Sequence, residues 1–212
     1  IMTCKLSKNI NRVIVSTEDE EIAEIAASYG AEVPYLRPKE YSTDGATDVG
    51  FLNHFFDNID AEEVALMRPT TPIREVGFVD KVIEIYMNQK KTLSGLRTMH
   101  EISENPYKLF KIENNFCESF FEEWEGNINY SNLPRQTFPK TYKPDGHIDI
   151  VKKETVRRGY TFGNKIFAVK GKKTIDIDSK DDLNMLLYTI EHLPNNWMSA
   201  LKKELNKCQK LK

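Results

Sequence analysis

Strand-like and helix-like segments alternate along the first half of this 212-residue chain, and this alternation constrains the fold most. Apolar, β-branched runs predict short strands at residues 12–16, 31–34 and 64–67. Apolar residues at three-four spacing predict helices that end at Gly30 and that span 48–59 and 76–87. Strand and helix repeats of these lengths indicate βαβ units, so we expect an α/β fold with a mostly parallel sheet flanked by helices.

The loops that follow the predicted strands define where a ligand would bind. In open α/β sheets, ligands bind outside the carboxyl ends of the strands. The loops at 16–19, 36–47 and 68–74 each follow a predicted strand. We therefore expect them to share one edge of the sheet.

The middle of the chain, residues 105–144, has a different character. It contains four prolines, clustered aromatic residues and few periodic stretches. It reads as an insertion, an extended hairpin with loops, and it divides the α/β domain into residues 1–104 and 145–212. It is either a long loop packed on its own domain or an exposed aromatic arm, and an exposed arm would favour dimerisation.

Regular patterns return after residue 145. The sequence predicts strands at 147–151, 165–169 and 174–178, and helices at 154–158, 180–193 and 197–207. The last of these helices is amphipathic and rich in lysine.

Charge and cysteine usage exclude several classes of function. Lys and Arg number 30 against 32 Asp and Glu, a net charge of -2, so we expect no nucleic-acid partner. No apolar run reaches the length of a transmembrane helix, so we expect no membrane partner. Cys4, Cys117 and Cys208 are far apart and form no CxxC pair, which indicates a reducing compartment and a cytoplasmic location.

Asp176 and Asp178 form a candidate metal site in the run Ile-Asp-Ile-Asp-Ser at 175–179. Side chains alternate across a strand, so a strand here would place both carboxylates on one face. Two carboxylates at a strand end suit Mg²⁺, which prefers oxygen ligands and bridges phosphate groups. Alternatively, Asp178 or Ser179 caps the following helix and Asp176 lies in solvent.

A second candidate is the loop Arg-Pro-Thr-Thr-Pro-Ile-Arg at 68–74, which places arginines and hydroxyl groups at the expected ligand edge. The arginine fork suits carboxylate and phosphate groups. The alternative is a rigid connecting loop with Arg74 in solvent.

A third candidate is the loop at 36–47, where Arg37 could hold a base carbonyl or a phosphate. The small residues at 42–47 would let a flat base approach the backbone. A turn that ends in a helix cap at Thr47 is the alternative.

Basic residues also occur in the insertion, where a carboxylate or pyrophosphate would need cations: Lys108, Lys111, Arg135, Lys140 and Lys143. Each of these residues taken singly is more often a surface charge. No GxSxG, GxGxxG or GxxxxGK[ST] motif is present, and no cysteine lies near a histidine in the sequence.

Taken in order, several blocks resemble the acylneuraminate cytidylyltransferase family, the CMP-sialic acid synthetases. The blocks are VIVSTEDEEIA at 13–23, YGAEVP at 29–34, LRP at 36–38, RPTTPIR at 68–74, NPYK at 105–108, PRQ at 134–136 and IDID at 175–178. The resemblance spans nearly the whole chain, and the joint order of the blocks is its specific signal.

The resemblance implies a Rossmann-like domain with an inserted dimerisation arm, acting as a homodimer. Family members transfer CMP from CTP to the anomeric hydroxyl of a nonulosonic acid, release pyrophosphate and require Mg²⁺. By this resemblance, Asp176 and Asp178 would be the magnesium carboxylates. Arg37, Ala46 and Thr47 would contact the nucleotide, and Arg68, Thr70 and Thr71 would contact the sugar. Lys108 and Arg135, on the arm, would reach a neighbouring subunit.

Three departures from the family pattern affect these expectations. Arg68 stands where sialic acid enzymes commonly have Gln, and the run Asp-Gly-His-Ile-Asp at 145–149 replaces the common Asn-Gly-Ala-Ile-Tyr. The family also opens with a strand and a phosphate-binding loop, whereas this chain opens at a segment that resembles the helix after them. We expect a chain without that loop to be poorly active. The alternative functions are a non-catalytic dimeric binding module and a glycosyltransferase that uses residues 176–178 as a metal-binding DxD.

Overall fold

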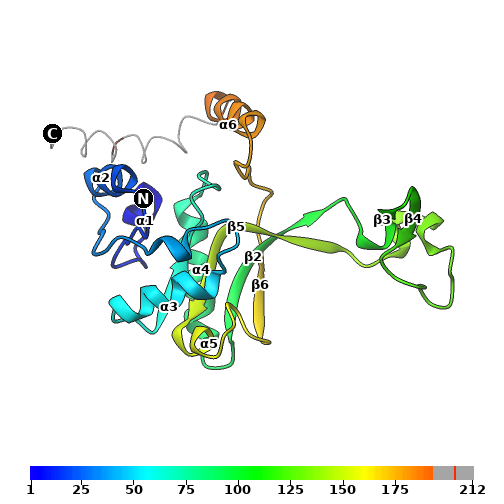
Figure 1. Ribbon diagram of the computed structural model, residues 1–212, viewed down its shortest axis with the longest axis horizontal. Helices are drawn as coiled ribbons and strands as arrows, with labels where there is room; N and C mark the ends of the chain where they lie inside the picture. Colours follow the sequence, from blue (N-terminus) through cyan, green and yellow to red (C-terminus); the bar gives the residue numbers. More distant parts are fainter. Residues whose placement is uncertain (193–202, 204–212) are drawn as a thin grey trace.

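A four-stranded sheet forms the centre of the computed structural model, which describes residues 1–192 and residue 203. The strands lie in the order β1 (Glu63–Leu66), β5 (Thr141–Lys152), β2 (Gly95–Ile102) and β6 (Ile166–Lys170) (Figure 1). β5 runs antiparallel to both β1 and β2, and β2 runs parallel to β6. Three of the four strands therefore run in one direction, which confirms the α/β prediction of a mostly parallel sheet.

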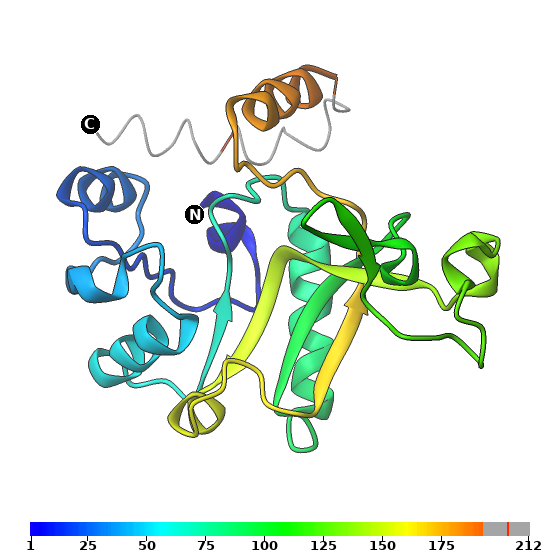
Figure 2. The same ribbon diagram turned by 45° about the vertical axis from the view of Figure 1, so that its right-hand side comes forward.

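Helices cover both faces of this sheet (Figure 2). α4 (Val76–Gln89) packs Val79, Val82 and Tyr86 against one face, as its three-four spacing predicts. α3 (Asp48–Asn58) and α5 (Lys153–Arg157) cover the opposite face, where Leu52 and its neighbours form a second apolar cluster. The sheet is thus the middle of three layers, and its carboxyl edge remains available for a site.

The predicted strands at 12–16 and 31–34 are reduced to a single parallel bridge between Ile14 and Glu32. The chain between them forms α2 (Glu20–Ser28), which Asp19 caps by accepting a hydrogen bond from the backbone N–H of Ile22 at 2.8 Å. The remaining helical elements of the domain are α1 (Met2–Leu6), the 3-10 turn η1 (Lys39–Tyr41) and α6 (Lys180–His192).

Residues 174–178 are not a strand, which corrects the prediction made for this segment. The segment crosses the carboxyl edge of the sheet, and the N–H of Ile177 donates to the carbonyl of Thr70 at 2.8 Å. This bond fixes the segment to a loop rather than to a neighbouring strand, so strand alternation does not govern its side chains. The predicted helix at 197–207 lies outside the described residues, apart from residue 203.

The inserted segment projects away from the sheet as an arm (Figure 1). Its tip carries the hairpin of β3 (Phe110–Glu113) and β4 (Phe116–Ser119), with 3-10 turns η2 (Pro106–Lys108), η3 (Tyr130–Asn132) and η4 (Arg135–Thr137). Tyr107 stacks on Phe138 with ring centroids 5.3 Å apart, so the arm has an aromatic cluster of its own. β5 begins at Thr141, which carries one long strand across the expected domain boundary at residue 145.

No helix among residues 1–192 is both long and apolar enough to cross a membrane.

The second apolar cluster makes a prediction about stability. Leu52 is 1% exposed, so Leu52→Ala should lower the free energy of unfolding by about 2–5 kcal/mol through lost burial and a residual cavity. Leu187 in α6 is 51% exposed, and Leu187→Ala should change the same quantity by less than about 0.5 kcal/mol. Denaturant unfolding measures both values, and equal losses would contradict the assignment of Leu52 to the core.

Candidate functional site

The loop after β1, the middle of β5 and the segment at 174–178 meet at the carboxyl edge of β1. Thr71 is fully buried, and its hydroxyl lies 3.4 Å from both the carbonyl of Asp145 and the carboxylate of Asp176. The hydroxyl of Thr174 also donates to the carbonyl of Asp145, at 3.1 Å. The structure therefore brings Thr70, Thr71 and Asp176 together at this edge.

Arg74 connects the loop after β1 to β5 through hydrogen bonds from its buried side chain. Its guanidinium donates from Nε to the carbonyl of His147 at 2.6 Å and from Nη2 to the carbonyl of Gly146 at 3.0 Å. Nη2 also donates to the carbonyl of Arg68. Burial lowers the pKa of Arg74 to about 10, although the nearby Cys4, Asp145 and Asp176 oppose the shift, so the group stays charged at neutral pH. Arg74 is buried rather than in solvent, and it braces the loop.

Gly146 is required by this close approach. Its φ is +67°, and a Cβ there would lie 2.7 Å from the Thr71 hydroxyl. A side chain at this position would both strain the backbone and push Thr71 away from Asp145.

Asp145 and His147 form a buried polar pair beside this turn. Oδ1 of Asp145 accepts hydrogen bonds from the Thr98 hydroxyl at 2.5 Å and from the N–H of His147 at 2.9 Å. Oδ2 of Asp145 and both ring nitrogens of His147 have no hydrogen-bond partner among the described residues. The His147 ring meets Phe78 edge-on, and burial lowers the pKa of its imidazole.

Two arginines and two aspartates form what we call the charged cluster: Asp48, Arg68, Arg97 and Asp149. Arg68 pairs with Asp48 at 2.5 Å, and Arg97 pairs with Asp149 at 3.2 Å. Burial raises the pKa of the Asp149 carboxyl, while Arg97 and Arg68 act in the opposite direction. Sequence motifs did not identify Asp48 and Arg97 as site residues, because their partners lie on other elements, 20 and 52 residues away.

The predicted nucleotide loop reaches the same region through α3. Arg37 donates to Glu18 and to the Ser42 hydroxyl, both at 2.9 Å, and lies over the Phe51 ring of α3. Ala46 closes a turn by donating its N–H to the carbonyl of Thr43 at 2.9 Å. Thr47 is the N-cap residue of α3, although its side chain makes no capping bond.

The amino-terminal half of α3 therefore joins the two candidate loops. Its first residue, Asp48, forms an ion pair with Arg68. The guanidinium of Arg37 lies over the ring of its fourth residue, Phe51. A ligand that spans both loops would lie across this end of the helix.

Asp178 is exposed, and its N–H donates to the carboxylate of Asp182 at 3.2 Å. Ser179 accepts from the N–H of Asp182 at 3.3 Å, so it takes the capping role for α6 and leaves the Asp178 carboxylate without a capping bond. No group of three metal-binding side chains exists within the described part of the chain. Asp176 and Asp178 are both exposed carboxylates, which is the oxygen-ligand chemistry that Mg²⁺ prefers.

The two candidate cations of the insertion lie on 3-10 turns of the arm, Lys108 at the end of η2 and Arg135 at the start of η4. Lys108 donates from Nζ to the carbonyls of Ser131 at 2.9 Å and Leu133 at 2.6 Å. Arg135 is exposed on η4 and lines a cavity of about 470 Å³ at the root of the arm. Lys108 thus braces the turn that precedes Arg135, while Arg135 itself is presented to solvent.

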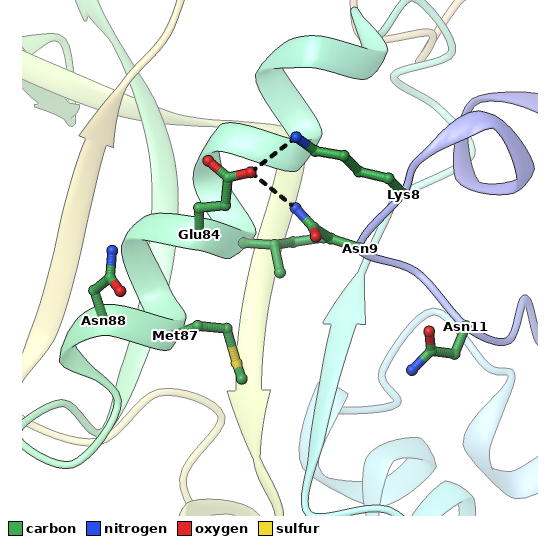
Figure 3. A pocket seen from close by; sticks show the side chains of 7 residues that line it. Lys8, Asn9, Asn11, Glu84, Met87 and Asn88 are labelled. Atoms are coloured by element: carbon green, nitrogen blue, oxygen red, sulfur yellow. Dashed lines mark hydrogen bonds and ion pairs between the residues drawn. The ribbon is translucent and has the colours of Figure 1, made fainter.

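A second hollow, of about 550 Å³, lies beside α4 and contains none of the predicted site residues (Figure 3). Glu84 crosses it, accepting from Lys8 at 3.2 Å and from Asn9 at 3.4 Å. Its charged groups, Lys8 and Glu84, are paired with each other and it contains none of the predicted site residues, so we place the candidate site at the carboxyl edge instead.

The brace made by Lys108 predicts a local effect. Lys108→Met removes two hydrogen bonds from a charged donor, each worth about 1.5–3 kcal/mol. Amide exchange at Asn132 and Leu133 should then speed by at least about tenfold, measured by hydrogen–deuterium exchange. Lys111→Met, which removes an exposed pair with Glu118, should leave these amides unchanged. Equal protection in the Lys108 variant would contradict the brace.

The buried imidazole of His147 predicts a pH dependence. Because burial lowers its pKa in the folded chain, the unfolded chain binds a proton more readily below its ordinary pKa of about 6.5. The resulting stability is present above pH 6.5 and is lost as the pH falls toward the lower folded-state pKa. The free energy of unfolding should therefore fall less steeply in His147→Gln than in the wild type between pH 7 and 5. Identical slopes would show that His147 does not contribute.

Comparison with known proteins adds evidence of ancestry and fold. The chain is 28% identical over 194 residues to the N-acylneuraminate cytidylyltransferase of Escherichia coli O18:K1:H7, covering 89% of this chain and 44% of that protein. It is 24% identical over 193 residues to the pseudaminic acid cytidylyltransferase of Campylobacter jejuni, covering 86% of this chain and 80% of that protein. No protein-family model matches the chain.

Solved structures support the fold. CMP:2-keto-3-deoxy-manno-octonic acid synthetase, in its CTP complex, superposes with a TM-score of 0.63 at 12% identity, covering 90% of this chain and 86% of that one. A 4-diphosphocytidyl-2C-methyl-D-erythritol synthase from Anaerococcus prevotii gives a TM-score of 0.58 at 14% identity, covering 90% and 83%. This chain thus spans less than half of the E. coli relative but most of the C. jejuni one. It is a homologue of the acylneuraminate and related nonulosonic acid cytidylyltransferases, built on a nucleotidyltransferase fold.

Proposed function

We propose that this chain carries the catalytic domain of an enzyme that transfers CMP from CTP to the anomeric hydroxyl of a nonulosonic acid. The anomeric oxygen attacks the α-phosphorus, the bond from phosphorus to the β-phosphate oxygen breaks, and pyrophosphate leaves. The proton of the attacking hydroxyl passes to solvent or to a nearby base.

One observation carries this proposal: three separate segments converge at the carboxyl edge of β1. Asp176 lies 3.4 Å from Thr71, and α3 links Arg68 to the loop of Arg37. Displacement at phosphorus by a hydroxyl depends on in-line placement and charge stabilisation, not on a protein nucleophile. Carboxylates, arginines and hydroxyls gathered at one edge suit that requirement.

Each part of the substrate pair is assigned to a segment. Arg37, Ala46 and Thr47 lie in the loop that would receive the cytosine and ribose. Arg68, Thr70 and Thr71 would face the sugar acid. Asp176 and Asp178 would hold Mg²⁺, which neutralises charge on the transferred phosphate when bound.

The arm is assigned to a homodimer. Large apolar side chains are exposed along it, and a patch of this kind on a soluble protein commonly marks an interface. They are Leu109, Phe110, Ile112, Phe116, Phe120, Phe121 and Ile128. In such a dimer Arg135 would reach the partner's site, while Lys108, already bonded to two carbonyls, would offer at most its third N–H.

The reaction is placed in the cytoplasm. Cys4 and Cys117 are both free thiols, as a reducing compartment would keep them.

The role of Asp176 is tested by Asp176→Asn in the full-length protein. This change keeps the shape but removes a charge beside the transferred phosphate, and it should lower kcat by about 100-fold or more. CMP-sugar formation from CTP, Mg²⁺ and a nonulosonic acid is the measurement. Asp181→Asn, in the exposed first turn of α6, is the matched control and should stay within about twofold of wild type.

Two results would contradict the proposal. One is a fully active Asp176 variant. The other is a wild-type protein that neither makes CMP-sugar nor is stabilised by CTP with Mg²⁺, which would favour a non-catalytic binding module.

A further inference from the structure

The charged cluster contains a buried ion pair, and a contribution to stability alone does not explain why this pair is buried. Arg97 and Asp149 face each other across β2 and β5, with Nε–Oδ1 at 3.3 Å and Nη2–Oδ2 at 3.2 Å. The side chain of Asp149 is 1% exposed. Taking two charges out of water costs several kcal/mol per ion, and apolar residues of similar volume often stabilise such a position equally well. A role beyond packing is therefore worth seeking.

The pair holds the Arg97 guanidinium in one orientation. Asp149 binds one edge of the fork, and the Phe162 ring lies 4.2 Å from the guanidinium carbon. Arginine has five N–H donors, and Asp149 takes only two of them. The Arg97 side chain remains 23% exposed, so donors in a fixed orientation are left at the surface. Donors that are already ordered bind an acceptor with little further loss of entropy.

The position of the pair is next to the proposed sugar site. Asp149 lies opposite Leu66, the last residue of β1. Arg68 follows Leu66 two residues later in the chain. Arg68 is close enough to influence the Asp149 carboxyl electrostatically. Through Asp149, Arg97 is therefore level with Leu66 in the sheet register, two residues before Arg68.

The charge of the cluster limits what it can recognise. Two arginines and two aspartates give a formal charge of zero, and each arginine already has a carboxylate partner. The cluster therefore has no excess charge to attract a second anion. Its free N–H donors suit a strong neutral acceptor, such as the carbonyl oxygen of an acylamino group.

We propose that Arg97, held by Asp149 and Phe162, is a specificity-determining residue that donates hydrogen bonds to an acylamino carbonyl of the sugar acid. It favours acylamino-bearing nonulosonic acids over 2-keto-3-deoxy-octonic acid, which has no acylamino group. This inference rests on the proposed cytidylyl transfer and names the substrate class for the same site.

The test compares three acids with the full-length protein, CTP and Mg²⁺: N-acetylneuraminate, N,N′-diacetyllegionaminate and 2-keto-3-deoxy-octonate. The quantity is the ratio of kcat/KM for the better acylamino acid to kcat/KM for 2-keto-3-deoxy-octonate. The variants are R97M/D149L, which replaces the pair by apolar side chains, and R97K, which keeps the charge but loses the fork. The control is R12M/E32L, which removes another forked pair, between Arg12 and Glu32, at the isolated bridge outside the four-stranded sheet.

We expect the wild-type protein to prefer an acylamino acid and the ratio to fall by about tenfold or more in both Arg97 variants, because a site built for a hydrogen bond loses discrimination without it. The control should keep the wild-type ratio. Thermal unfolding shows whether each variant is folded. If R97M/D149L does not fold, the ratio measured for R97K decides the test.

Two outcomes would overturn the inference while leaving the proposed function standing. The first is a folded Arg97 variant with an unchanged ratio. The second is a wild-type protein that uses all three acids equally well. If the wild type transfers CMP to none of the acids, the proposed function itself fails, and this inference fails with it.

Discussion

The buried guanidinium of Arg74 is the interaction on which the candidate site depends. It donates to the carbonyls of Arg68, Gly146 and His147, and so joins the loop after β1 to the middle of β5. Hydrogen bonds from a charged group are about twice as strong as neutral ones, and a buried arginine left without them would be costly. With this joint in place, Thr71 comes within reach of Asp145 and Asp176, and the segment at 174–178 is held over the sheet edge.

Around this joint, the edge separates two kinds of polar group. The buried groups, Arg74, Asp145 and His147, keep the backbone in place, and two of them carry polar atoms without a protein partner. The exposed or half-exposed groups, Arg37, Arg68 and Asp176, face outward from three different segments. Hydrogen-bonded loops position these side chains, and such preorganisation would suit a displacement at phosphorus.

Much of the fold could be predicted from periodicity alone. α3 and α4 follow their apolar spacing closely, since each buries one stripe of side chains. β2, which received no strand assignment, places Arg97 and the polar Thr98 in the centre of the sheet, where their partners lie on β5. Residues 147–151 form a strand as expected, within β5, and all five are buried because helices cover both faces of the sheet.

The site could be predicted only in part, because motifs identify residues but not their partners. The loop at 68–74 and Asp176 were recognised as separate motifs, and the fold brings them together across 105 residues of sequence. The contacts of Arg68 with Asp48 and of Lys108 with two arm carbonyls depend on tertiary packing. Residue spacing in the sequence does not reveal such tertiary contacts, so the sequence did not predict the charged cluster.

We propose that CTP binds across the carboxyl edge of β1, between the loop at 36–47 and Asp176. A crystal structure of the full-length protein with CTP and Mg²⁺ would locate the nucleotide. We expect cytosine against the Arg37 loop, the triphosphate over the first turn of α3, and the metal ion on Asp176 and Asp178. A nucleotide bound elsewhere, such as in the hollow beside α4, with the edge empty, would contradict it.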